Sequence, residues 1–70
     1  MLVQLGDPSL VDDLCTHFRR SGFTADQAGP NLVEVRRPDA PGAEQERREV
    51  DVHLRVWQAQ NPEAEVELLS

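Results

Sequence analysis

The spacing of the apolar residues changes several times along this chain, and each spacing predicts an element of secondary structure. Residues 2–5, "LVQL", are a short apolar run closed by "GDP", which is typical of a strand. Asp7 is placed to cap a helix after it, and Pro8 suits the first turn because the N–H that proline lacks would have no partner there. The next apolar residues recur at helical spacing: Leu10, Val11, Leu14 and Phe18.

Gly22 and Phe23 mark the predicted end of this first helix. Glycine accepts the left-handed backbone that ends many helices, and Phe23 is placed to fold back onto the last turn. Two short extended segments follow, residues 23–28 and 31–37, and they are separated by "GP". They predict a hairpin, with its weak, polar first strand at a sheet edge. The inward side chains of the second strand are Val33 and Val35.

The stretch "VDVHLRVW", residues 50–57, fits two structures. As a strand it alternates apolar and other residues almost throughout. As a helix it divides its apolar residues between two sides, with Val50, Leu54 and Trp57 on one side and Val52 and Val56 on the other. The longer segment 43–60 lacks proline and glycine, begins with good helix formers, and lies between "PDAPG" and "NP". We therefore predict a helix over 43–60, with a strand at 50–57 as the alternative.

The last segment, "AEVELL" at 64–69, alternates again and predicts a strand. The resulting order is strand, helix, strand, strand, helix, strand, which is that of the split βαβ or ferredoxin-like arrangement. Right-handed crossovers in this arrangement place both helices on one face of a four-stranded antiparallel sheet. We predict a single α+β domain of this class over residues 1–70. Many unrelated functions share the arrangement, so it does not indicate an activity.

Composition disfavours several classes of function. The net charge of −6 argues against a nucleic acid or an acidic membrane as the partner, since both attract positive surfaces. The predicted central strands carry no aromatic residue, which disfavours RNA binding on the sheet face. The beginning "MLVQLGDPSL" is unlike a signal peptide, and no apolar run is long enough to span a bilayer. We expect a cytoplasmic protein.

Residues suited to catalysis or metal binding are few and poorly spaced. Cys15 is the only cysteine, and its place beside the apolar stripe predicts a buried thiol. His17 points about 200° around the helix from it, so it is badly placed to act as its base. Asp13 with His17, and Glu49 with His53, are carboxylate–histidine pairs at i, i+4, but no CxxC, HxxxH or HExxH is present. We predict no metal and no cofactor, and we favour a binding module over an enzyme.

All seven basic residues are arginines, and six of them form doublets at 19–20, 36–37 and 47–48. The predicted topology brings these doublets to one edge of the domain. We therefore name a candidate anion-binding patch, formed by Arg20, Arg36, Arg37 and Arg47. The alternative is that these arginines only complement helix ends and neighbouring glutamates. The acids expected to gather at the opposite edge are Asp7, Asp12, Asp13, Glu63 and Glu65.

The helix over 43–60 also carries a second, thinner apolar stripe, formed by Val52, Val56 and Ala59. Valine is a mediocre helix former, and an exposed helix position does not require it. Isolated apolar residues on a surface are normal, which is one explanation of the stripe. The other is a contact surface, since burial of two valines contributes about 3 kcal/mol to association. A chain of this size has a marginal core, so association would help it.

These patterns favour a small non-catalytic regulatory or protein-interaction module that is oligomeric or a subunit of a larger assembly. Its expected partner is a second copy of the chain or another protein, and neither a nucleic acid nor a membrane. The alternative is an anion or small-ligand sensor, or an enzyme, that uses the arginine patch. Nucleic-acid binding is a weaker alternative.

Overall fold

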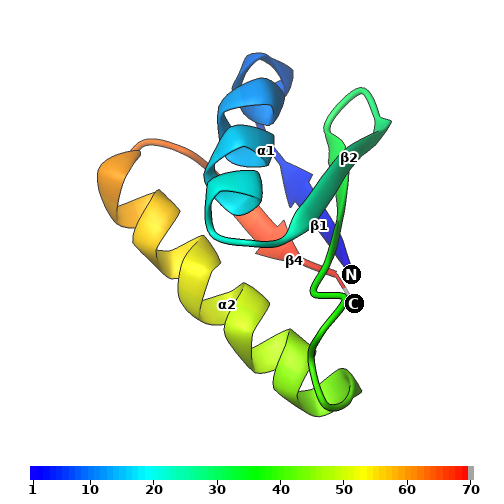
Figure 1. Ribbon diagram of the computed structural model, residues 1–70. Coiled ribbons are helices and arrows are strands. Elements are labelled where there is room, and N and C mark those ends of the chain that lie inside the picture. The colour runs from blue at the N-terminus through cyan, green and yellow to red at the C-terminus, as the bar shows by residue number, and fades with distance from the viewer. Residues whose placement is uncertain (70) are drawn as a thin grey trace.

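The computed structural model describes residues 1–69 and contains four strands and two α-helices in that range (Figure 1). In chain order the elements are β1 (Leu2–Leu5), a 3-10 turn (Pro8–Leu10), α1 (Val11–Arg20), β2 (Thr24–Gly29), β3 (Leu32–Arg36), α2 (Ala43–Gln60) and β4 (Val66–Leu68). Each predicted strand and helix is present. The segment 43–60 is helical along its whole length, which confirms the helix and rejects a strand at 50–57.

The four strands form one antiparallel sheet in the order β2-β3-β1-β4. β1 and β3 are therefore central, and β2 and β4 form the two edges. The prediction that the polar first strand of the hairpin lies at an edge is confirmed. Both helices lie on the same side of the sheet (Figure 1). The α+β class, the four-stranded antiparallel sheet and the two helices are as predicted.

One core fills the space between the helices and the sheet. The strands contribute Val3, Leu5, Val33 and Val35, all of them fully buried. The helices contribute the two largest buried side chains, Trp57 and Phe18, together with Leu14, Val50 and Leu54. Val66 and Leu68 of β4 are only half-buried at the margin of this core.

The segment that leads into α1 starts with a capped 3-10 turn. The Asp7 carboxylate accepts hydrogen bonds from the Ser9 hydroxyl at 2.8 Å and from the Ser9 backbone N–H at 2.9 Å. These two bonds lower the pKa of Asp7, because they stabilise its charged form. The α-helix itself begins at Val11. Asp7 therefore caps the N-terminus of the 3-10 turn and not, as the sequence predicts, that of the α-helix.

The end of α1 follows the predicted pattern. Gly22 has a φ of 89°, in the left-handed region that favours glycine. The Phe23 N–H donates to the Phe18 carbonyl at 3.0 Å, and the Gly22 N–H donates to the Arg19 carbonyl at 3.2 Å. This pair of bonds is a Schellman motif. The rings of Phe18 and Phe23 pack edge to face with their centroids 5.2 Å apart, so the turn leads the chain straight back into the core.

Candidate functional site

The outer surface of α2 carries the predicted apolar stripe, which we call the α2 stripe (Val52, Val56 and Ala59). Val52 is 52% exposed and Val56 is 48% exposed. Ala59 is also exposed, so all three residues are open to solvent. The stripe runs beside an ion pair between Arg55 and Asp51, whose charged atoms are 3.1 Å apart. The structure therefore places an uncharged strip on a helix face that is otherwise charged.

Of the four arginines in the candidate anion patch, Arg37 is the most tightly held. Its Nε donates to the Asp39 carboxylate at 3.1 Å, and its Nη1 lies 3.8 Å from the Glu49 carboxylate on α2. Nη1 also donates to the Ser21 carbonyl at the end of α1, at 3.4 Å. The guanidinium carbon lies 4.9 Å from the centroid of the Phe23 ring. Arg37 thus links the end of β3 to both helices.

The other three arginines of the patch differ in their partners. Arg36 Nε is 3.4 Å from the Glu46 carboxylate, and its Nη1 is 4.0 Å from Glu34. Arg20 and Arg47 are exposed, and neither makes an ion pair with residues 1–69. Two of the four candidate ligands are therefore already paired with carboxylates. Anion binding by the patch stays a prediction.

Arg19 has a role that its sequence position did not indicate. Its guanidinium donates twice to the backbone carbonyl of Ala25 in β2, through Nε at 3.0 Å and Nη2 at 2.5 Å. The same group lies 3.7 Å from the Asp26 carboxylate. The sequence shows only an arginine at a helix end. The contact depends on which carbonyls of β2 point away from the sheet.

The single cysteine and residues of the two carboxylate–histidine pairs take part in packing and in hydrogen bonds. Cys15 is 4% exposed, and this burial raises the pKa of its thiol. Asp13 accepts a hydrogen bond from the indole N–H of Trp57 at 2.8 Å. The Nε2 of His17 lies 3.0 Å from the carbonyl oxygen of His53. Within residues 1–69, no group of three or more His, Cys, Asp and Glu side chains is arranged to hold a metal ion.

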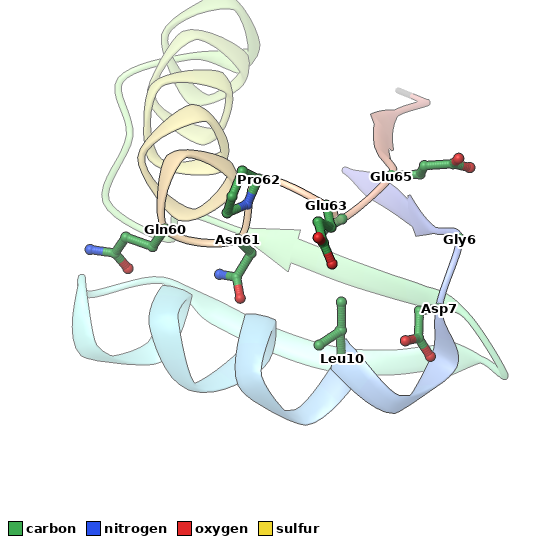
Figure 2. Close-up of a pocket in the computed structure, with 9 residues that line it drawn as sticks. Gly6, Asp7, Leu10, Gln60, Asn61, Pro62, Glu63 and Glu65 are labelled. Atoms are coloured by element: carbon green, nitrogen blue, oxygen red, sulfur yellow. The ribbon is translucent and has the colours of Figure 1, made fainter.

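A depression on the described surface lies between the loop after β1 and the loop before β4 (Figure 2). It has a volume of about 660 Å³ and is open to solvent. Figure 2 shows the side chains of Leu10 and Glu63 directed into it and that of Glu65 directed away. Its three carboxylates, those of Asp7, Glu63 and Glu65, are all exposed.

No protein-family model, no curated protein and no solved structure matches this chain. Among residues 1–69, neither helix has the length and apolar character needed to cross a bilayer.

Proposed function

We propose that this chain is a small non-catalytic regulatory or protein-interaction module that works as an oligomer or as a subunit of a larger assembly. The exposure of Val52 and Val56 on α2 carries the proposal. Both residues lie about 160° around α2 from the buried Leu54 at 100° per residue, so the core does not explain them. Covering both valines would contribute about 3 kcal/mol toward association.

The proposal includes the ferredoxin-like topology. β1 and β2 both run antiparallel to β3, and β3 and β4 both run antiparallel to β1. Each helix therefore joins two parallel strands that are separated by one antiparallel strand. This connectivity supports the split βαβ arrangement. A cytoplasmic location and a protein partner are further parts of the proposal.

The test is a pair of charges placed on the α2 stripe. We expect the wild-type chain to sediment with a mass above the 7.9 kDa of one copy, because the stripe is covered by a second copy. The double variant Val52→Glu/Val56→Glu should stay folded and sediment with a lower mass, since buried unpaired carboxylates oppose association. Circular dichroism checks the fold.

The matched control is Thr16→Glu/Ala28→Glu. Both positions are exposed and lie outside α2, and the change in net charge is the same. This variant should keep the mass of the wild type. A monomeric wild type at high concentration, together with unchanged partner capture by the Val52→Glu/Val56→Glu variant, would show that the stripe is only surface.

A further inference from the structure

The two edges of the sheet differ in how their outward backbone groups are covered. The register of β2 against β3 directs the backbone groups of Ala25 and Gln27 away from the sheet. At this edge the Arg19 guanidinium binds the Ala25 carbonyl, and Ala25 itself is 1% exposed. The Gln27 side chain donates to the Gly29 carbonyl at 2.8 Å. At Ala25, a side chain therefore guards the β2 edge against another strand.

Among the described residues, none guards the β4 edge in this way. The Glu65 carbonyl accepts a hydrogen bond from the N–H of Gly6, just after β1, and the Leu69 N–H donates to the Leu2 carbonyl, at 2.8 Å each. Glu67 faces Gln4 between them. The alternation of an antiparallel ladder then directs the N–H and C=O groups of Val66 and Leu68 away from the sheet. Within residues 1–69, no side chain makes a hydrogen bond to these groups.

The core is also incomplete beside β4. The register places Val66 and Leu68 on the same face as the buried Leu5 and Val3, but the two β4 side chains are only half-buried. An open hollow of about 430 Å³ separates Leu68 from α2. A further strand at this edge would pair with the free backbone groups and place alternate side chains over the hollow.

The side chains on the other face of β4 indicate which residues an added strand would need. Glu65 and Glu67 both point to the open face of the sheet and are exposed. A strand paired with β4 would set its own open-face side chains beside these two carboxylates. Opposite charges at such cross-strand positions stabilise a sheet, and like charges destabilise it.

We propose that the β4 edge binds an extended segment of another protein in which apolar residues alternate with Arg or Lys. Backbone hydrogen bonds to Val66 and Leu68 provide the pairing, as in other cases of strand addition. The apolar residues cover the half-buried side chains, and the basic residues pair with Glu65 and Glu67. A second copy of β4 suits the edge poorly, because antiparallel pairing centred on the strand sets Glu67 opposite Glu67 or Glu65 of the copy. The inference rests on the proposed role as a binding module but uses a different surface from the α2 stripe.

The probe is a short synthetic peptide in which valine and arginine alternate, titrated into isotope-labelled protein. We expect saturable shifts of the Val66 and Leu68 amides and about tenfold slower hydrogen exchange there, because these N–H groups gain partners. The Ala25 amide at the guarded edge should not change. A peptide with glutamate in place of arginine should not bind.

Charge reversal on β4 makes the test specific. Glu67→Arg should abolish binding of the arginine peptide and create binding of the glutamate peptide, whereas Glu63→Arg, an equal change at an exposed turn position, should leave binding as in the wild type. The Val52→Glu/Val56→Glu variant should also bind the arginine peptide, so the two proposals can fail separately. Undiminished binding by the Glu67→Arg variant, or saturable shifts confined to residues away from β4 and the adjoining hollow, overturns the inference. So does slow exchange at Val66 and Leu68 that depends on protein concentration alone, which would identify a second copy as the occupant.

Discussion

Single side chains in this molecule take their roles from partners that are distant in sequence. Asp13 stands at i, i+4 from His17, which suggests a surface pair, yet it binds the indole N–H of Trp57 on α2 at 2.8 Å. The reason is that the Trp57 ring is buried, and a buried indole N–H needs an acceptor. The burial of Cys15 could be predicted, because it depends on helical spacing alone. The Asp13 contact could not, because it depends on how α1 and α2 are placed against each other.

The thiol of Cys15 should be unreactive in the folded chain. Burial raises its pKa, so the reactive thiolate is scarce at neutral pH and the sulfur is also covered. We expect iodoacetamide to label the native protein far more slowly than the protein in urea, as measured by mass spectrometry. The Cys15→Ala variant provides the blank. Equally fast labelling in both states would contradict the buried position.

Local sequence patterns were sufficient to predict both helices and most of the strands. Residues 43–60 are a helix because good helix formers fill a segment between proline-rich stops, and these signals need no tertiary information. The difference between the two edges of the sheet, in how their outward backbone groups are covered, could not be predicted from local patterns. Whether Arg19 covers the outward Ala25 carbonyl depends on the strand register, which in turn depends on the bulge between Gln27 and Gly29.

The contact between Arg19 and β2 should have a measurable effect on stability. Arg19→Ala removes two hydrogen bonds from a charged donor to the Ala25 carbonyl, and we expect the free energy of unfolding to fall by about 1 kcal/mol. Arg20→Ala is the matched control, since Arg20 is exposed and makes no ion pair with residues 1–69. It should change stability by less than about 0.5 kcal/mol. Urea unfolding measures both, and equal effects would show that the edge contact contributes nothing.

The topology of the whole chain gathers the arginines of the patch, but it also gathers carboxylates that neutralise two of them. The topology brings Arg37 from the end of β3 to the end of α1 and to the first half of α2. The same topology also brings Asp39, Glu46 and Glu49 to this place, and they neutralise Arg36 and Arg37. The sequence shows where charges occur along the chain, but side-chain direction decides which of them pair.

This neutralisation leads to a prediction about anions. In the wild-type chain, phosphate must displace the carboxylates of Glu46 and Glu49 to reach Arg36 and Arg37, so we expect amide shifts that do not saturate. The double variant Glu46→Gln/Glu49→Gln removes one carboxylate partner from each guanidinium group and leaves Glu34 and Asp39 in place, so phosphate meets less competition at Arg36 and Arg37. The amide oxygens of the variant can still accept hydrogen bonds. We expect saturable shifts near Arg37 in this variant. The control Glu63→Gln/Glu67→Gln removes the same charge elsewhere and should behave as the wild type. Saturable phosphate binding by the wild type would instead support the alternative function, an anion sensor. It would mean that phosphate competes successfully with the carboxylates that the chain itself places beside Arg36 and Arg37.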